Sequence, residues 1–301
     1  MTGPIRIGTR GSALALWQAR TVAALLEQHG RAVEIVTIKT QGDRIQDRPL
    51  SETGGKNLFV KEIEDILLAG NVDVAVHSAK DMSVAVPGGL GIAAVLPRED
   101  PRDALVFRSG LAQLSADAAI ATGSIRRITQ MRTRFPHARF KPVRGNVDTR
   151  LRKLDSGEFD ALVLACAGLK RLGHGDRISE AVSHDDCIPA PCQGIVAIET
   201  RAGDLADPVW TAINDPRARE AFDAERAVVS ALGGGCQLPL GAIAVHEGGD
   251  LAMQAIVAAP DGSSTVKRSA RGPASRPGEL GRQLAGELEK GGALRILNSL
   301  R

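Results

Sequence analysis

Strand-like and helix-like segments alternate along the first third of the 301-residue chain, and this alternation restricts the fold more than any other feature. Apolar, β-branched runs occupy residues 5–9, 33–40 and 72–77, and helical periodicity occupies residues 12–29 and 57–69. A βαβαβ order predicts a largely parallel sheet, because each helical crossover returns the chain to the same end of the sheet. The first third therefore predicts an α/β unit.

A second alternation begins near residue 100 and is followed by a different pattern. Strands are expected at residues 103–107, 118–122, 139–143 and 160–165, with helices after three of them. The apolar run 195–200 has no place in this second block and could return to the first sheet. Residues 216–301 combine helical periodicity at both ends with three consecutive strand patterns, which predicts an α+β domain with an antiparallel sheet. The predicted domains are 1–96 with 194–214, 99–190, and 216–301.

The charge balance and the hydropathy pattern exclude several functional classes. The formal net charge is +3, because 38 Lys and Arg nearly cancel 35 Asp and Glu. Aromatic residues make up 3% of the chain and none is tyrosine, so stacking platforms for single-stranded nucleic acid are lacking. No apolar run approaches the roughly 20 residues that span a bilayer, and the amino terminus does not resemble a secretion signal. We expect a cytoplasmic protein without nucleic-acid or membrane partners.

The cysteines predict neither a disulfide framework nor a metal site. They lie at positions 166, 187, 192 and 236 without a CxxC pair or a histidine at zinc-ligand spacing. Cys236 differs from the others because it follows Gly233, Gly234 and Gly235, which leave the backbone mobile and unshielded. It is either a buried small apolar residue or an accessible thiol on a flexible loop.

Basic and hydroxyl residues follow four predicted strands, where helix amino termini attract anions in α/β sheets. They are Arg10, Ser12, Ser78, Lys80, Thr122, Ser124, Arg126, Arg127, Arg144 and Arg150, and Gly145 lies in the same turn as Arg144. Arg126 and Arg127 in a first helical turn oppose the helix dipole by about 0.3–1 kcal/mol each, and a bound anion would remove that conflict. One such turn is an ordinary solvated surface in most proteins, but four of them in two units favour an anion site.

The missing phosphate-binding motifs and the abundance of arginine favour carboxylates as the anion. Neither a GxxxxGK[ST] loop nor a GxGxxG pattern occurs in the chain. Arginine binds carboxylates through two parallel hydrogen bonds. A single carboxylate, Asp81, lies among the cationic residues beside Lys80. It either pairs with a neighbouring cation or stabilises positive charge and relays protons during a reaction.

Ordered motifs along nearly the whole chain resemble those of the porphobilinogen deaminase family. They are Arg6-Ile7-Gly8-Thr9-Arg10-Gly11-Ser12, Gly54-Gly55-Lys56, His77-Ser78-Ala79-Lys80-Asp81, Gly123-Ser124-Ile125-Arg126-Arg127, Arg144-Gly145-Asn146-Val147-Asp148-Thr149-Arg150, Ala167-Gly168-Leu169-Lys170-Arg171 and Gly234-Gly235-Cys236-Gln237. Each motif alone is weak, and their combination in this order is specific.

The resemblance implies a fold and an activity. The implied fold has two periplasmic-binding-protein-like α/β lobes and a smaller α+β C-terminal domain that carries Cys236. The implied enzyme is a monomeric transferase of tetrapyrrole and haem biosynthesis. It joins four porphobilinogen molecules head to tail with loss of ammonia, and water then releases linear hydroxymethylbilane.

The resemblance also implies the site residues. Cys236 carries a covalent dipyrromethane primer through a thioether, and Asp81 is the catalytic carboxylate. The residues implied to bind cofactor or substrate carboxylates are Arg10, Ser12, Lys56, Ser78, Lys80, Thr122, Ser124, Arg126, Arg127, Arg144, Gly145, Arg150, Arg171 and Gln193, the last of them near an interlobe hinge.

The chain departs from the family pattern at two places. Ala79 replaces the methionine of His-Ser-Met-Lys-Asp-Val-Pro, and Met82-Ser83 follows Asp81. Pro191-Cys192 replaces Val-Gly before Gln193, which predicts a stiffer hinge with an added thiol. Loop and domain motion are the properties that these departures affect.

Two other functions stay open at this point. A non-enzymatic two-lobed binding protein for an acidic ligand would account for the two α/β units and the cationic turns, but not for the segment 233–236. A cysteine-nucleophile hydrolase would pair Cys236 with His77 or His246, although the sequence has no recognised nucleophile and base signature.

Overall fold

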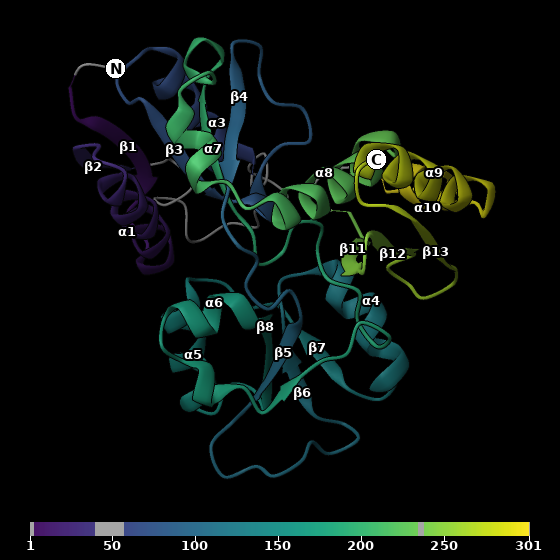
Figure 1. Cartoon of the computed structure of the whole chain (residues 1–301). Helices are drawn as coiled ribbons and strands as arrows, with labels where there is room; N and C mark the ends of the chain where they lie inside the picture. Colours follow the sequence, from purple (N-terminus) through teal and green to yellow (C-terminus); the bar gives the residue numbers. More distant parts are fainter. Residues whose placement is uncertain (1–2, 40–56, 234–237, 301) are drawn as a thin grey trace. The chain divides into compact units, whose positions relative to one another are not determined.

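The computed structural model describes residues 3–39, 57–233 and 238–300, with the side chains of residues 57–59 excepted (Figure 1). The chain forms two compact units, Met1–Glu99 with Ile195–Arg219, and Asp100–Gly194 with Glu220–Arg301. The division of the chain into three domains stays a prediction.

The first unit contains a five-stranded sheet in the order β2-β1-β3-β10-β4. Its strands are β1 (Ile5–Arg10), β2 (Val33–Ile38), β3 (Val74–Ser78), β4 (Leu90–Val95) and β10 (Val196–Arg201). β1 pairs parallel with β2 and β3, and β10 pairs antiparallel with β3 and β4. The predicted return of residues 195–200 to the first sheet is confirmed, whereas β4 was not anticipated.

Helices cover both faces of the first sheet because its strands are apolar on both sides. The helices are α1 (Ala13–Gln28), α3 (Asn57–Leu68) and α7 (Pro208–Ile213), with a 3₁₀ turn η1 (Ala79–Asp81) after β3 and another, η3 (Ala202–Asp204), after β10. Val22 and Leu26 of α1 pack with Trp210 of α7 in one core cluster. Ile63 and Leu67 of α3 pack in a second cluster. Cover on two faces explains why the central strands β3 and β10 are buried along almost their whole length.

The second unit contains a mixed five-stranded sheet in the order β7-β6-β8-β5-β9. Its strands are β5 (Asp103–Phe107), β6 (Ala119–Ala121), β7 (Arg139–Lys141), β8 (Ala161–Ala165) and β9 (Glu180–Ala181). Its helices are α4 (Ile125–Arg134), α5 (Val147–Asp155) and α6 (Cys166–Arg171), and the 3₁₀ turn η2 (Gly175–Arg177) follows. Successive β5 residues point to opposite faces, so Val106 joins the cluster under α5 and α6 while Leu105 joins the cluster under α4.

An antiparallel sheet, β11-β12-β13, completes the second unit. Its strands are β11 (Leu240–Glu247), β12 (Asp250–Ala258) and β13 (Thr265–Pro273). The accompanying helices are α8 (Pro216–Ala231), whose residues up to Arg219 belong to the first unit, α9 (Pro277–Lys290) and α10 (Ala293–Asn298). The predicted fold class, two α/β sheets followed by a small α+β region with an antiparallel sheet, is confirmed. In the described ranges, no helix combines the length and apolar character needed to cross a bilayer.

Candidate functional site

The predicted residues of the first unit lie at the carboxyl ends of two adjacent parallel strands. Arg10 ends β1 and Ser78 ends β3, and the two strands are hydrogen-bonded neighbours. Ser12 caps α1, with its Oγ accepting a hydrogen bond from the Ala15 amide at 3.3 Å. The buried Gln18 of α1 donates from Nε2 to the Ser78 Oγ at 2.8 Å. This hydrogen bond connects the first half of α1 to the end of β3. The hydroxyl and cationic groups that follow β1 and β3 therefore lie at one edge of the sheet.

Lys80 and Asp81 lie in η1, directly after β3, and both are partly exposed. The turn is held by the Ala79 amide, which donates to the Ile195 carbonyl at 3.0 Å. Ala79 and Met82, two of the three residues that depart from the family pattern around Asp81, are both 3% exposed. Their side chains therefore anchor the turn, and Asp81 between them keeps access to solvent.

His77 is buried within the sheet and faces a carboxylate. Its Nε2 lies 3.2 Å from the Oε2 of Glu199, which is on the adjacent strand β10. Within the described ranges the other Glu199 oxygen, Oε1, is buried without a hydrogen-bond partner. The pairing of β3 with β10 creates this contact between residues that are 122 positions apart in the chain. The sequence alone therefore offers no reason to single out Glu199.

In the second unit, Thr122 and Ser124 form the turn between β6 and α4. Thr122 is buried and its Oγ1 accepts a hydrogen bond from the Ser124 amide at 3.3 Å. Ser124 is the N-cap residue of α4. The turn brings Arg126 and Arg127 into the first turn of the helix, as the sequence predicted.

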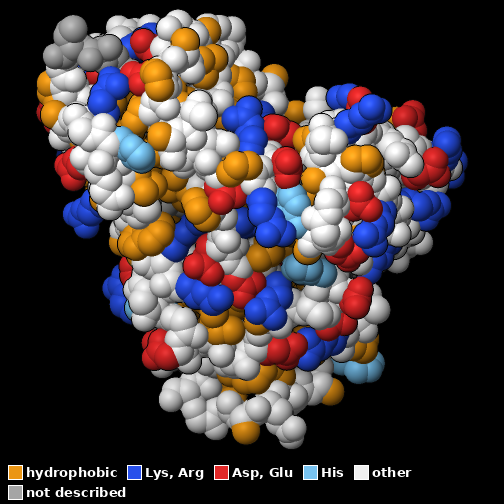
Figure 2. All heavy atoms as spheres, in the orientation of Figure 1, with side chains coloured by type: hydrophobic (Ala, Val, Ile, Leu, Met, Phe, Trp, Pro, Cys, Tyr) orange, Lys and Arg blue, Asp and Glu red, His pale blue; other side chains and the backbone are white. Residues whose placement is uncertain are grey.

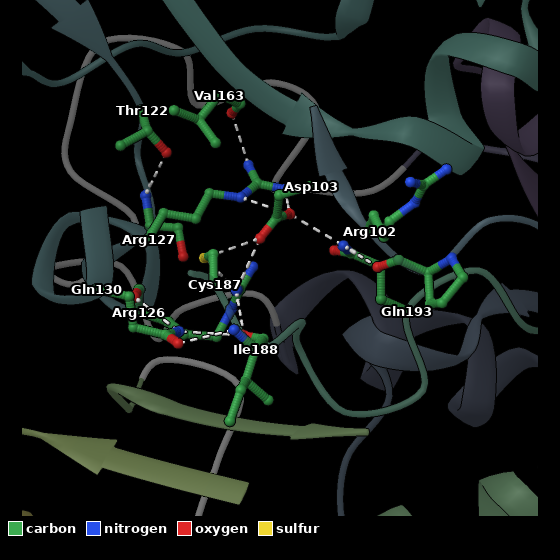
Figure 3. Close-up of polar contacts among 12 residues, drawn as sticks. Arg102, Asp103, Thr122, Arg126, Arg127, Gln130, Val163, Cys187, Ile188 and Gln193 are labelled. Atoms are coloured by element: carbon green, nitrogen blue, oxygen red, sulfur yellow. Dashed lines mark hydrogen bonds and ion pairs between the residues drawn. The ribbon is translucent and has the colours of Figure 1, made fainter. Parts of the chain in front are cut away.

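Both arginines are buried and paired with one internal carboxylate, Asp103 (Figure 3). Arg126 Nη1 lies 2.8 Å from Asp103 Oδ2, and Arg127 donates to Oδ1 from Nε at 3.0 Å and Nη2 at 2.8 Å. Burial raises the pKa of Asp103, but Arg126 and Arg127 outweigh it and hold that pKa well below its usual value. A bound anion was expected to offset the unfavourable dipole. The structure corrects that expectation, because a carboxylate of the chain itself supplies one negative charge.

The turn between β7 and α5 contains Arg144, Gly145 and Arg150. Gly145 has φ +109°, and a Cβ there would lie 2.6 Å from Thr149 Cγ2. Its carbonyl accepts a hydrogen bond from Arg150 Nε at 2.8 Å. β6 and β7 are adjacent parallel strands, so this turn and the turn with Arg126 lie at the same edge of the second sheet.

Arg171 contacts the end of the stretch 100–194 of the second unit, and Gln193 lies in that end and contacts the start of the stretch. Arg171 donates from Nη2 to the Gly194 carbonyl at 2.7 Å. The buried Gln193 donates from Nε2 to the Pro101 carbonyl at 2.7 Å and to Asp103 Oδ1 at 2.9 Å. Cys192 has φ +61°, the left-handed conformation that favours glycine, which is the usual residue there in the family pattern.

Two predicted residues, Lys56 and Cys236, lie outside the described residues, and their roles stay predictions. Sequence inspection missed Asp103, although one signal was present: a charged residue opens the buried apolar strand Asp103–Phe107. Figure 2 shows Lys and Arg side chains interspersed with Asp and Glu on the face drawn, in keeping with the small net charge.

The donor set suits an organic polycarboxylate. Arginine, lysine and hydroxyl donors gather at the carboxyl ends of strands in each unit, and such donors bind carboxylates through charge-assisted hydrogen bonds. No group of three or more His, Cys, Asp or Glu side chains that could hold a metal ion occurs in the described part of the chain.

Comparison with protein-family models decides among the candidate functions. Residues 5–207 match the model described as porphobilinogen deaminase, dipyromethane cofactor binding domain, and residues 220–290 match the porphobilinogen deaminase C-terminal domain. The chain belongs to the porphobilinogen deaminase family. This membership does not favour the binding-protein alternative.

Two relatives in the porphobilinogen deaminase family match nearly end to end. The porphobilinogen deaminase of Chromobacterium violaceum is 48% identical over 295 residues, which cover 96% of this chain and 95% of the relative. That of Thiobacillus denitrificans is 46% identical over 301 residues, which cover 98% of each chain.

Solved structures outside the porphobilinogen deaminase family are more distant. A putative methionine-binding lipoprotein from Bacillus subtilis has a TM-score of 0.42 at 12% identity, covering 69% of this chain and 87% of that one. A nutrient binding protein from Burkholderia cenocepacia, bound to methionine, has a TM-score of 0.44 at 13% identity, covering 69% and 89%.

Proposed function

We propose that this chain is a transferase that condenses four porphobilinogen molecules head to tail, releases ammonia at each addition, and liberates linear hydroxymethylbilane by hydrolysis. The observation that carries the proposal is the match of both family models, at residues 5–207 and 220–290. The reaction belongs to tetrapyrrole and haem biosynthesis. We further propose a cytoplasmic monomer whose small-molecule partner is porphobilinogen, without nucleic-acid or membrane partners.

The matched domain binds a dipyrromethane cofactor, and the side chains of this structure fit such a group. When bound, the dipyrromethane supplies the free pyrrole carbon to which the first substrate is joined. Its acetate and propionate side chains are carboxylates, which arginine binds through two parallel hydrogen bonds. The buried pair Arg126 and Arg127 carries two positive charges against the one negative charge of Asp103, so one positive charge is left for a ligand carboxylate. Cys236 is the proposed attachment point through a thioether.

Asp81 is the proposed catalytic carboxylate. Asp81 is the acidic residue of η1. It comes directly after Lys80 and three residues after Ser78, which ends β3. Departure of ammonia leaves positive charge on the substrate, and a carboxylate that accepts hydrogen bonds from the pyrrole N–H groups stabilises that charge. The neighbouring cations bind the substrate carboxylates, and Asp81 thereby meets the developing cation in a fixed orientation.

The remaining proposed binding residues divide between the two units. Arg10, Ser12, Ser78 and Lys80 belong to the first unit, and Lys56 belongs to the same stretch of chain. Thr122, Ser124, Arg144, Gly145, Arg150, Arg171 and Gln193 belong to the second. Hydroxyl and guanidinium donors in both units support recognition of a ligand with many carboxylates.

The test is intact-mass measurement of the purified protein with peptide mapping around Cys236, followed by turnover with porphobilinogen. We expect a two-pyrrole adduct on Cys236 and ammonia release. Cys236→Ser, with Cys166→Ser as the matched control, should lose the adduct and turnover, while the control keeps both. A free thiol that stays free after incubation with porphobilinogen would contradict the proposal and favour a non-enzymatic protein that binds acidic ligands.

A further inference from the structure

Asp103 is the centre of a buried network that joins the arginine pair to residues 187–193 (Figure 3). It is the first residue of β5 and has no exposed surface. Besides the two guanidinium groups, its Oδ1 accepts the Gln193 amide at 2.9 Å, and its Oδ2 accepts the Cys187 thiol at 3.4 Å. Four side chains from two separate stretches of the chain, 126–127 and 187–193, therefore converge on one carboxylate.

Both arginine side chains are also hydrogen-bonded to backbone carbonyls of other residues. Arg126 Nη1 also donates to the Ile188 carbonyl at 2.7 Å, and Arg127 Nη1 donates to the Val163 carbonyl at 2.8 Å. Gln130 forms two hydrogen bonds with the backbone of Ile188: its Oε1 accepts from the Ile188 amide at 2.7 Å, and its Nε2 donates to the Ile188 carbonyl at 3.0 Å. The guanidinium groups consequently have fixed directions before any ligand arrives.

The charge count of the network is unusual for a protein interior. Two guanidinium cations face one carboxylate, and the Cys187 thiol is neutral because burial, followed by the charge of Asp103, raises its pKa to about 12. Without Asp103 two buried cations would lie side by side, and an unpaired buried charge is strongly unfavourable. With Asp103 ionised, Arg126, Arg127 and Asp103 together carry a single net positive charge.

Gln193 extends the network to two of the three places where the chain passes from one unit to the other. It precedes the crossing at Gly194 and Ile195, and its second hydrogen bond goes to the carbonyl of Pro101, just after the crossing at Glu99 and Asp100. The side chain that donates to Asp103 is therefore next to one of these crossings and is hydrogen-bonded beside the other.

We infer that Asp103 is a positioning residue of the proposed reaction: it sets the net charge and the direction of the Arg126 and Arg127 pair for one ligand carboxylate, and it links that pair to Gln193. The inference rests on the proposed function. The inference also states that the two buried cations require a carboxylate between them for stability. This statement can be tested without measuring turnover.

The first experiment compares Asp103→Asn with Asp160→Asn. Asp160 pairs with Arg108 and precedes β8, near the opposite end of the β5–β8 pair from Asp103, so it is a matched Asp and Arg control. We expect kcat/KM for porphobilinogen to fall on the order of tenfold or more in Asp103→Asn, mainly through KM, because misdirected binding groups cost this much. Asp160→Asn should stay within about twofold, since its ion pair is partly exposed and the asparagine Oδ1 can still accept the hydrogen bond from the Ala119 amide. Equal kinetics for Asp103→Asn and wild type would overturn the inference.

The second experiment uses sodium formate as a substitute carboxylate. Asp103→Ala leaves room beside the arginines, and formate should raise its Tm more than sodium chloride does at equal ionic strength. Wild type and Asp160→Ala should show a smaller difference between the two salts. Equal responses to formate and chloride in all three proteins would overturn the inference. Absence of turnover in the wild type, together with a formate-specific response in Asp103→Ala, would refute the proposed function and leave the structural role of Asp103 supported.

Discussion

Arg6 and Asp73 join β1 to the segment before β3 through a two-point contact. Arg6 Nε donates to Asp73 Oδ2 at 2.9 Å and Arg6 Nη2 donates to Oδ1 at 2.9 Å, and Arg201 Nη2 reaches the same Oδ1 at 3.1 Å. Burial raises the pKa of Asp73, but these hydrogen bonds outweigh burial and lower the pKa to about 2. The carboxylate therefore stabilises the folded first unit only in its ionised form.

This contact predicts an acid-dependent contribution to stability. The native pKa lies below the unfolded value of about 3.9, so the contribution is complete above that value and disappears as the pH falls toward 2. Asp73→Asn should lower the free energy of unfolding by about 1 kcal/mol at pH 7 and by much less at pH 2. Denaturant unfolding at several pH values measures both, with exposed Asp65→Asn as control. A constant difference between wild type and Asp73→Asn across this range would contradict the prediction.

Asp81 should be necessary for turnover and dispensable for folding. Its side chain is partly exposed in a turn anchored by buried Ala79 and Met82, so removal of the carboxylate leaves the packing intact. Asp81→Ala should reduce kcat by about a hundredfold or more, because electrostatic stabilisation of this kind has that magnitude. Steady-state kinetics and thermal unfolding would be measured together. Full activity in Asp81→Ala, or a large loss of Tm, would refute the assigned role.

Gly145 and Gly157 flank the same helix, α5, and should tolerate alanine differently. At Gly145 an added Cβ would lie 2.6 Å from Thr149 Cγ2 and 2.8 Å from Thr149 Cβ, so rotation of Thr149 cannot relieve the clash. At Gly157, with φ +84°, no atom of the described residues lies within 4 Å of the added Cβ. Gly145→Ala should cost about 3 kcal/mol of unfolding free energy and Gly157→Ala about 1–2 kcal/mol. Denaturant unfolding would reveal the difference, and equal costs would argue against the clash.

The thiols of Cys166 and Cys187 should be inert in the folded protein. Burial raises both pKa values to about 12, assisted by Asp100 for Cys166 and by Asp103 for Cys187. At pH 8 the thiolate fraction is then about three orders of magnitude below that of a free cysteine. Iodoacetamide labelling followed by peptide mass spectrometry should detect both cysteines only after unfolding. Rapid labelling of either one in the native protein would contradict this.

Local patterns predicted most of the regular structure. The predicted strand 103–107 coincides with β5, and the predicted helix 12–29 contains α1, because a short continuous apolar run and a helical periodicity each report directly how an element is buried. The short helices α7 and α10 and the two-residue strand β9 were missed, since segments this short contain too few residues to show a period.

The sequence by itself determined the alternation of strands and helices, the ordered motifs that identify the family, and the chemical type of the candidate site. All of these depend on residues that are close along the chain. Only the tertiary structure decided that β10 lies between β3 and β4, that Glu199 faces His77, and that Asp103 receives Arg126, Arg127 and Gln193. The physical reason is that a buried charge pairs with whichever opposite charge the packed sheet brings within hydrogen-bonding distance, and residues 23 to 122 positions apart leave no local trace of that choice.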